Sequence, residues 1–462
     1  MTKPGLLLLL LCAAALCAAA PLPPADAPLD DPAAVLQFNK ATGKLKILQF
    51  ADMHFENGAA TACNSLTPAQ AAWPCTDLNT TDFLRRLIEV EQPDLVLFTG
   101  DNIDGGASNA TQAMDMWSAV LAHFPGLQWA AVEGNHDAQS TLSRQDVFKV
   151  LSSLPGSISQ PGPSTLHGFG NYYIAVANAT GARVLNLFLL DTGADSEFPA
   201  ISGYDWAWPD QVSWYLHTSQ ALYALQGNRT LPSVAFYHIC TPEYWEALDA
   251  HVPLSGDNFE RGGCSAANSG LFTAFLEQGD VKMTNVGHDH VNDYCANWKG
   301  IDLCYGGGCG FGHGAYGKTG WARRARVIEL GQDAATGEGT IETWKRLDYY
   351  LGNLAIIDRE QIWPEPPAPV IKSCSACVAQ KRVWCYNDNT CFAHGDHNDT
   401  KPGTCPGSTN CASDSGCDCT SCDDAKCQPK KDARGHWHSW QQRRTDYVPS
   451  EWRPAHHDGE DD

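Results

Sequence analysis

Seven side chains that can bind metal ions, and an eighth that can donate a proton, occur in five short strings along the chain. The strings are Asp52-Met53-His54, Gly100-Asp101, Gly134-Asn135-His136-Asp137, His238 and Gly287-His288-Asp289-His290. Carboxylate, amide and imidazole groups supply the oxygen and nitrogen ligands of catalytic metal sites. Two metal ions about 3.5–4 Å apart can clamp the oxygens of a phosphate ester and activate a water molecule. The strings therefore predict a two-metal hydrolytic site.

The chemistry of each donor indicates a role for it. Asp101 follows an apolar run and suits a carboxylate that bridges two ions, while Asp52 and His54 alternate in an extended segment and can reach one ion. A neutral amide oxygen comes from Asn135. The remaining donors are imidazoles: His238, His288 and His290.

His136 is expected to be catalytic and not to bind metal. It follows Asn135 directly, so its side chain should point elsewhere than the ions. Above the substrate phosphate, it could protonate the leaving oxygen. An imidazole near its ordinary pKa can do this at mildly acidic to neutral pH.

Short apolar runs precede all five strings and read as buried strands. They are Lys46–Phe50, Leu95–Phe98, Trp129–Val132, Val234–Tyr237 and Val281–Val286. Runs rich in Val, Ile, Leu and Phe that stop at glycine or a polar residue are typical of such strands. Open α/β sheets place their active sites at the carboxyl ends of their strands, which is where the donors would lie.

Helical patterns alternate with these runs. Apolar positions spaced by three and four residues predict a helix over Thr81–Glu91, capped by Thr80 or Thr81, and similar patterns cover Met114–Phe124 and Val212–Leu225. Alternating strands and helices indicate an α/β fold with helices covering the sheet faces. One more strand, Val184–Leu190, ends at Asp191, which we interpret as a turn residue because the ligand set is already complete.

The amino terminus predicts entry into the secretory pathway. Lys3, an apolar stretch at residues 6–16 and small residues at 18–20 are typical of a signal peptide, expected over residues 1–20. The stretch is too short for a membrane span, and no later segment is long and apolar enough for one. Glycosylation sequons fit this route, at Asn79, Asn109, Asn178, Asn228 and Asn398. We expect the protein to be extracellular or vacuolar-lysosomal.

The formal net charge of −22 argues against a nucleic-acid-binding surface, which needs basic patches. Substrate anions must then be attracted locally, by metal ions or a few cationic side chains. The expected partner is therefore a small phosphorylated substrate.

Two proline-rich segments divide the chain. A spacer at 21–36 precedes a main domain at 37–363, and a linker at 364–372 precedes a Cys-rich domain at 373–427 and a polar tail at 428–462. Ten cysteines between Cys374 and Cys427, with few apolar residues, indicate a domain held together by disulfides. The order Cys374, Cys377, Trp384-Cys385 and Cys391 resembles the start of a plexin–semaphorin–integrin module, which implies a possible extracellular binding partner.

Other cysteines are expected to pair within the main domain. Cys63 with Cys75, and Cys295 with Cys304, are close enough in sequence to close short loops. Cys240 is expected to pack in the core or to pair with either Cys264 or Cys309. Of the 19 cysteines, Cys12 and Cys17 lie in the signal region, which leaves an odd number and at least one thiol without a partner in the chain.

The ordered strings resemble the calcineurin-like metallophosphoesterase superfamily, whose pattern is D-x-H, GD, GNH[DE], a lone His and GHxH. The resemblance spans nearly the whole main domain and implies a four-layer α/β/β/α sandwich. It also implies two ion positions. The first would be held by Asp52, His54, Asp101 and His290, and the second by Asp101, Asn135, His238 and His288, with His136 as the acid.

Three stretches are similar to the divergent, purple-acid-phosphatase-like branch of that superfamily. They are Leu48–Gly58, Val96–Asp104 and Val286–Tyr316. Typical purple acid phosphatases carry an iron-binding tyrosine three residues after the bridging aspartate, where this chain has Asp104, and a glycine where it has His54. The ions are therefore expected to be Zn, Mn or Fe, with ferric iron in doubt and no purple colour.

Some motifs are interpreted more simply. The glycine-rich run Gly306–Gly317 lacks the Lys-Ser/Thr of a P-loop and is expected to be a tight loop near the site, with the role of His313 left open. Three arginines, Arg323, Arg324 and Arg326, are expected at outward positions of a strand, outside the site. Three tryptophans, Trp206, Trp208 and Trp214, are expected to pack against helices or rim a cleft, and this interpretation is favoured over a platform on which a nucleotide or sugar stacks.

The expected function is hydrolysis of phosphate monoesters by in-line attack of a metal-bound hydroxide, as in acid phosphatases. Its rivals are a phosphodiesterase or nucleotide pyrophosphatase on the same site, more remotely a Ser/Thr protein phosphatase, and an extracellular binding protein whose main domain is inactive.

Overall fold

The structure is a computed structural model that describes residues 29–317, 321–348 and 354–365, and three short strands further along the chain. The chain forms two compact units, residues 1–367 and 368–462. In the second unit the described strands are β15 (Val383–Cys385), β16 (Thr390–Phe392) and β17 (Cys411–Ser413), which form a sheet in the order β16-β15-β17. The expected signal peptide, the 366–372 part of the linker and the polar tail lie outside the described residues, as does the cysteine pairing of the second unit.

A six-stranded sheet in the first unit carries three of the five strings. Its order is β14-β13-β12-β2-β3-β4. Its strands are β2 (Leu45–Phe50), β3 (Leu95–Thr99), β4 (Gln128–Val132), β12 (Arg323–Gln332), β13 (Gly339–Asp348) and β14 (Leu354–Trp363). Strands β2, β3 and β4 run parallel, so their carboxyl ends share one edge, and β12 to β14 add antiparallel strands.

An eight-stranded sheet carries the other two strings, with the order β1-β5-β6-β7-β9-β11-β10-β8. Its strands are β1 (Val35–Gln37), β5 (Tyr172–Ala177), β6 (Arg183–Leu189), β7 (Ser233–Phe236), β8 (Leu254–Ser255), β9 (Val281–Val286), β10 (Cys295–Trp298) and β11 (Ile301–Tyr305). Strands β6, β7 and β9 are parallel neighbours.

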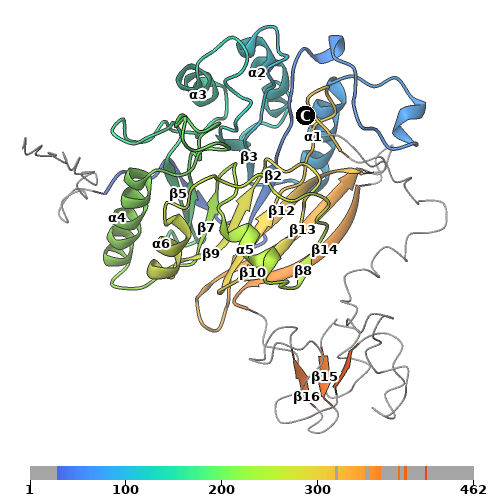
Figure 1. Ribbon diagram of the computed structural model, residues 1–462. Helices are drawn as coiled ribbons and strands as arrows, with labels where there is room; N and C mark the ends of the chain where they lie inside the picture. The colour runs from blue at the N-terminus through green and yellow to red at the C-terminus, as the bar shows by residue number, and fades with distance from the viewer. Residues whose placement is uncertain are drawn as a thin grey trace, which may run out of the picture. The chain divides into compact units, whose positions relative to one another are not determined.

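The two sheets pack face to face between two layers of helices (Figure 1). Helices α1 (Leu78–Glu91), α2 (Ala110–Ser118) and α3 (Arg144–Ser153) cover the outer face of the six-stranded sheet. Helices α4 (Pro209–Leu225), α5 (Glu243–Asp249) and α6 (Leu271–Gln278) cover the eight-stranded sheet. This confirms the α/β class and the predicted α/β/β/α order of layers.

The alternation of side chains along β3 shows how the layers form. Val96 and Phe98 join the core beneath α1, α2 and α3, whereas Leu95 and Leu97 join the core between the sheets. Because successive residues of a strand point to opposite faces, an uninterrupted apolar run fits a strand that is buried on both sides. Packing on both faces of the sheet thereby fixes the positions of the carboxyl ends of β2, β3 and β4.

Element boundaries differ from the sequence prediction where a cap or a turn intervenes. Helix α2 begins at Ala110 because the Asn109 side chain accepts a hydrogen bond from Gln112 N, and it ends at Ser118, before a 3-10 turn at Leu121–His123. At the amino terminus, β1 pairs in parallel with β5 from Val35 onward, so the sheet begins inside the segment expected to be a spacer.

Three disulfides are present in the first unit: Cys63–Cys75, Cys240–Cys264 and Cys295–Cys304. The first and third confirm the prediction, and the second decides between the two partners considered for Cys240. Among the described cysteines, Cys309 is free and buried.

The arginines of β12 are not outward-facing, and this expectation was wrong. Arg323, Arg324 and Arg326 are each 3 % exposed or less. Arg324 pairs with Asp293, and Arg326 Nη2 donates to Asp293 O at 2.7 Å. The buried arginines are tolerated because acceptors lie beside them: Asp293 for Arg324 and Arg326, and Asn64 O for Arg323.

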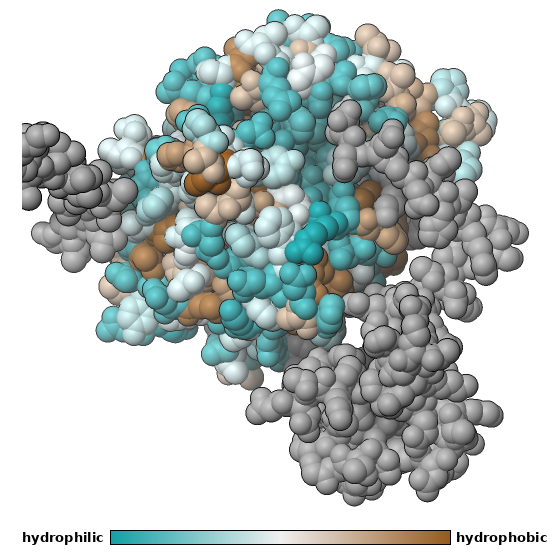
Figure 2. Space-filling view, viewed as in Figure 1, coloured by the Kyte–Doolittle hydropathy of each residue, from teal (hydrophilic) through white to brown (hydrophobic). Residues whose placement is uncertain are grey.

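The visible surface of the first unit mixes hydrophilic and hydrophobic residues, with no single broad apolar face in the view of Figure 2. No helix within the described residues has the length and apolar character needed to cross a membrane.

Candidate metal centre

The loops that follow β2 and β3 run side by side and bring the first donors together. Asp52 N donates to Gly100 O at 3.2 Å, and His54 N donates to Asp101 O at 2.9 Å. Asp52, His54 and Asp101 have φ angles of 55°, 44° and 49°, and His288 has 74°. Positive φ is costly for residues other than glycine and clusters at functional sites, so four of the eight predicted site residues occupy strained backbone.

Asp101 lies at the centre of the site. Its Oδ2 is 3.3 Å from His54 Nε2 and 3.2 Å from His238 Nε2, so one oxygen faces imidazoles from both sheets. Its Oδ1 accepts a hydrogen bond from His136 N at 2.8 Å. This is the position that a bridging carboxylate requires.

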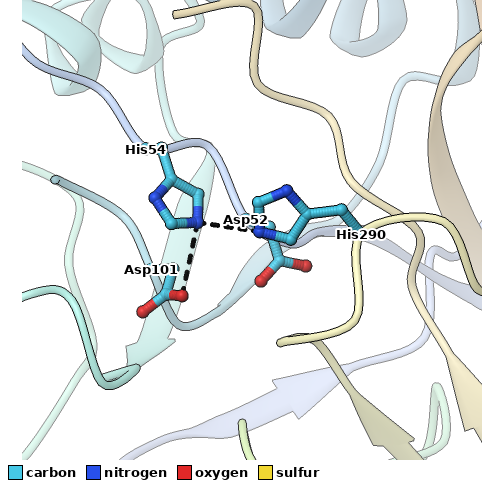
Figure 3. A group of neighbouring side chains, drawn as sticks. All are labelled: Asp52, His54, Asp101 and His290. Carbon is cyan, nitrogen blue, oxygen red and sulfur yellow. Dashed lines mark hydrogen bonds and ion pairs between the residues drawn. The ribbon is translucent and has the colours of Figure 1, made fainter. Parts of the chain in front are cut away.

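A first donor group consists of Asp52, His54, Asp101 and His290 (Figure 3). One ligand atom from each lies within 4.8 Å of the others, and all four residues are buried. The Nε2 atoms of His54 and His290 face each other at 2.9 Å. Among the described residues, Asp52 Oδ2 is buried without a hydrogen-bond partner, while Oδ1 accepts from His288 N at 2.7 Å.

A second donor group consists of Asp101, His238 and His288, joined by Asn135. Asn135 Oδ1 is 3.0 Å from His238 Nε2. His288 packs edge-on against the ring of Tyr204, with ring centroids 4.2 Å apart. All seven predicted donors are thus gathered at one edge, in two groups that share Asp101.

The tautomers of the histidines show that these groups suit cations. His238 Nδ1 is 2.8 Å from Thr99 O, and a carbonyl only accepts, so Nδ1 carries a proton and Nε2 is the nitrogen that can give its lone pair to a cation. That lone pair faces Asn135 Oδ1 and Asp101 Oδ2, which are also acceptors. Three acceptors that converge need a positive charge between them, which a proton or a metal ion can supply.

The pKa values express the same demand for positive charge. Burial lowers the pKa of His54, but the hydrogen bond and the charge of Asp101 outweigh burial and raise it to about 10. His238 behaves in the same way, with a pKa of about 9. Burial and the neighbouring charged imidazoles lower the pKa of His288 to about 3 and that of His290 well below its usual range. Each donor group therefore contains one imidazole that takes up a proton when no ion is bound, His54 in the first and His238 in the second, and a bound metal ion would take the place of that proton.

His136 lies beside the groups and outside both of them. Its ring centroid is 4.9 Å from that of His54, and its Nδ1 is 2.7 Å from Gln139 Oε1. His136 is only partly buried, whereas the seven predicted donors are all buried. The role of His136 as a proton donor stays a prediction.

Three supporting residues were not recognised from the sequence as parts of the site. Buried Asp137 accepts hydrogen bonds from Gly134 N at 2.7 Å and Ile103 N at 2.9 Å, which tie the β3 and β4 loops together. Arg144 Nη1 donates to Gly134 O at 2.7 Å. Asp104 Oδ2 is 2.8 Å from His54 Nδ1. The Asp after GNH was a signal for the first of these, whereas no local pattern pointed to Arg144.

Asp191 is bound by residues outside the two donor groups. Its carboxylate pairs with Arg144, and it accepts hydrogen bonds from Phe169 N at 2.7 Å and Gly193 N at 2.9 Å. The bond to Gly193, two residues on, is a turn contact, as expected.

The tryptophans also have structural partners. Trp208 stacks on His167 with centroids 3.6 Å apart and lies near-parallel to Trp206, while Trp214 Nε1 donates to Asp30 Oδ2 at 2.9 Å. These contacts fit the expectation that the tryptophans pack against protein groups.

The glycine-rich run approaches the donors as expected. Gly310 N donates to Asp52 O at 3.1 Å, and Gly308 forms a parallel bridge with Ala51. Tyr316, at the end of the run, stacks on His290 with centroids 3.7 Å apart. His313 itself is exposed.

Comparisons with known proteins identify the family of the chain. The model of the calcineurin-like phosphoesterase family matches residues 45–292. A protein of Arabidopsis thaliana named "Probable inactive purple acid phosphatase 29" is 42 % identical over 344 residues, covering 70 % of this chain and 86 % of that protein. "Phosphatase DCR2" of Saccharomyces cerevisiae is 34 % identical over 327 residues, covering 66 % of this chain and 54 % of that protein. A crystal structure of a dimetal phosphatase from Danio rerio aligns over 69 % of this chain and 98 % of that one, with 14 % identity and a TM-score of 0.42. The chain belongs to the calcineurin-like phosphoesterase family.

Proposed function

We propose that the protein is a two-metal phosphatase that hydrolyses phosphate monoesters. The observation that carries this proposal is the convergence of two donor groups on Asp101 Oδ2, with His136 beside them. In this proposal, Asp52, His54, Asp101 and His290 hold one ion, and Asp101, Asn135, His238 and His288 hold the other. A bound ion pair supplies Lewis-acid chemistry, which neutralises phosphate charge and acidifies water.

The residues of the chain orient the reaction. Asp101 fixes the β4 loop by accepting His136 N, which sets where the His136 ring stands relative to a substrate at the donor groups. Gln139 Oε1 accepts from His136 Nδ1, which leaves Nε2 as the atom that gives a proton to the departing alkoxide. A positioned general acid contributes about 10²–10⁴-fold to such a step.

The word "inactive" in the name of the Arabidopsis relative raises the alternative of a binding protein with a dead catalytic domain. That alternative predicts that donor positions have been lost. All seven positions carry metal-binding side chains here, and the orphaned Asp52 Oδ2 is costly to bury unless something pairs with it. Both observations support activity.

Turnover and metal content together test the proposal. The purified protein should hydrolyse an aryl monophosphate faster than the matching aryl diester, and it should contain two metal ions per chain. Asp101→Asn and His238→Ala should lose metal and activity together. His136→Ala should keep both ions and lose about 10²–10⁴-fold in kcat. His123→Ala, in an exposed turn, is the matched control.

The contrary results are equally specific. Retention of both metal and activity by Asp101→Asn and His238→Ala would refute the assigned site. Faster cleavage of the diester would favour the phosphodiesterase alternative.

We also propose that the protein is made in the secretory pathway. Its disulfides need an oxidising compartment, and two of the sequon asparagines, Asn109 and Asn228, are exposed. Treatment of the secreted protein with an endoglycosidase should lower its apparent mass. An unchanged mass, or recovery of the protein only from the cytosol, would contradict this.

A further inference from the structure

Asp104 has both carboxylate oxygens engaged beside the first donor group. Its Oδ2 is 2.8 Å from His54 Nδ1, and its Oδ1 accepts a hydrogen bond from Gly106 N at 2.9 Å. A carboxylate without a proton only accepts, so His54 Nδ1 is the donor in this pair. The side chain of His54 is 2 % exposed and that of Asp104 is 16 % exposed.

Backbone pairing sets this contact. Phe55 and Ile103 form a parallel bridge, Phe55 N donates to Asn102 O at 3.2 Å, and Asp104 N donates to Phe55 O at 3.2 Å. The two loops thus extend the pairing of β2 with β3 beyond the sheet. This register places Asp104 beside His54, so the contact is set by the backbone and does not depend on the side-chain rotamer alone.

Gly314 packs against the same pair from the glycine-rich run. A Cβ at this position would lie 2.2 Å from Asp104 Oδ2, which is closer than atoms approach, and 3.1 Å from His54 Nδ1, which is a tight contact. Only a residue without a side chain fits there unless Asp104 moves. The run therefore covers the hydrogen bond and shields it from water.

The contact decides which nitrogen of His54 can bind a cation. Because Nδ1 donates to Asp104, Nε2 is the nitrogen that faces Asp101 Oδ2 and His290 Nε2, 3.3 and 2.9 Å away, and it is the one that can give its lone pair to a cation. A carboxylate that holds the second nitrogen of a metal-binding histidine fixes its tautomer and orientation and raises its basicity.

A third ion among His54, Asp104 and His136 is the competing interpretation, since ligand atoms of these three lie within 4.8 Å of one another. The hydrogen bonds argue against it. Both Asp104 oxygens and His54 Nδ1 are already engaged, and His136 Nδ1 pairs with Gln139. The group is better explained as support for the first ion position.

We propose that Asp104 is a positioning residue of the first donor group, which holds His54 with its Nε2 turned toward the ion, and that Gly314 is needed for the loop to close over this pair. This rests on the proposed ion pair and goes beyond it by assigning residues that touch neither ion nor substrate. With two carboxylates and two imidazoles, the first position suits a divalent ion such as Zn²⁺.

Zinc binding by the full chain, measured without substrate, tests the proposal. Wild type should bind two Zn²⁺ in chelator competition. Asp104→Ala should weaken one of them about 10–100-fold and leave the other unchanged. Asp104→Asn should lose less, because an amide oxygen still accepts from Nδ1. Zinc X-ray absorption should show fewer imidazole ligands in Asp104→Ala.

Glycine variants probe the pair without removing the carboxylate. Gly314→Ala should weaken the same Zn²⁺ by displacing Asp104. Gly317→Ala is the matched control, since its methyl group would meet the flexible Nη1 end of Arg323 at 2.9 Å and Trp321 only at ordinary contact distances of 3.5 and 3.6 Å, and should leave zinc binding unchanged. If Asp104→Ala does not fold, Gly314→Ala alone decides.

Wild-type affinity for both ions in Asp104→Ala, or in Gly314→Ala, would overturn the proposal. Equal losses in Asp104→Ala and Asp104→Asn with a lowered melting temperature would also overturn it, because that pattern indicates a purely structural role. A protein that binds zinc in an Asp104-dependent way but cleaves no ester would refute the proposed function and leave this inference standing. Turnover of monoesters together with unchanged zinc affinity in Asp104→Ala would support the proposed function and refute this inference.

Discussion

Arg144→Ala should destabilise the protein more than the loss of any exposed ion pair. The guanidinium of Arg144 joins the β4 loop to the loop after β6. It pairs with both oxygens of Asp191 and donates to Gly134 O at 2.7 Å and Glu133 O at 3.3 Å. The Arg144 side chain is 16 % exposed and that of Asp191 is fully buried. The substitution therefore leaves a carboxylate and two carbonyls inside the protein without their cationic partner.

The expected cost follows from that burial. Removing one partner of a buried ion pair costs about 3–5 kcal/mol, because the other charge stays uncompensated. Glu133 Oε2 also lies 3.3 Å from Arg144 Nε, but burial raises the pKa of the Glu133 carboxyl well above its usual range, which reduces the charge that the substitution leaves uncompensated. A loss of this size is a large fraction of the total stability of a domain, which is about 5–15 kcal/mol.

Urea denaturation at pH 7 measures the loss, with Arg261→Ala as the matched control. Arg261 and Asp249 form an ion pair whose side chains are 66 % and 62 % exposed, so its removal should cost only about 0–1 kcal/mol. Zinc affinity at the second donor group should also fall in Arg144→Ala, since Gly134 precedes Asn135. A free energy of unfolding within about 1 kcal/mol of wild type would refute the reasoning.

Three further predictions concern single contacts. Burial raises the pKa of Asp302 from 3.8 to about 7, so the folded state keeps a proton that the unfolded chain releases, and wild-type stability falls as pH rises through this window. Asp302→Asn cannot lose stability in this way. Its free energy of unfolding minus that of wild type should therefore be larger at pH 8 than at pH 4, by on the order of 2–4 kcal/mol, measured by urea denaturation at both pH values. The double change Cys240→Ser and Cys264→Ser opens a loop with a sequence separation of 24 and should cost about 3–4 kcal/mol, seen as a lower melting temperature. Gly134→Ala puts a Cβ 2.1 Å from Asp101 Oδ1 and should cost about 1–3 kcal/mol and weaken metal binding, measured by calorimetry and metal analysis.

Each of these has a result that contradicts it. A pH-independent difference for Asp302→Asn would show that this carboxyl titrates normally in the folded protein. Wild-type melting of the double serine variant would mean that the disulfide does not form. Unchanged metal content in Gly134→Ala would show that the loop can yield without moving Asp101.

Local patterns were enough to predict much of the fold. Strand β9 has the predicted bounds, Val281–Val286, because an apolar run there stops at a glycine. Helix α2 was predicted less well, since its cap at Asn109 and its end at Ser118 depend on turns that apolar spacing does not reveal. Strands β12 to β14 were not identified individually. Their inward arginines look like outward polar residues unless the acceptors opposite them are known.

The sequence by itself determined which side chains carry the chemistry and which class of fold positions them. Donor types are read directly from residue identity, and strands that end at those donors are read from short apolar runs. The tertiary structure decided which residues support the donors and which cysteines pair. Asp104 contacts His54, Arg144 forms an ion pair with Asp191, and Cys264 is the partner of Cys240. These contacts join segments 24 to 50 residues apart in sequence, and they exist only once the sheets pair and bring their loops level. The physical reason is that the ability to bind a metal ion belongs to a single side chain and can be read from its residue type. The contacts that hold that side chain in place depend on how two loops are aligned, which only the folded structure shows.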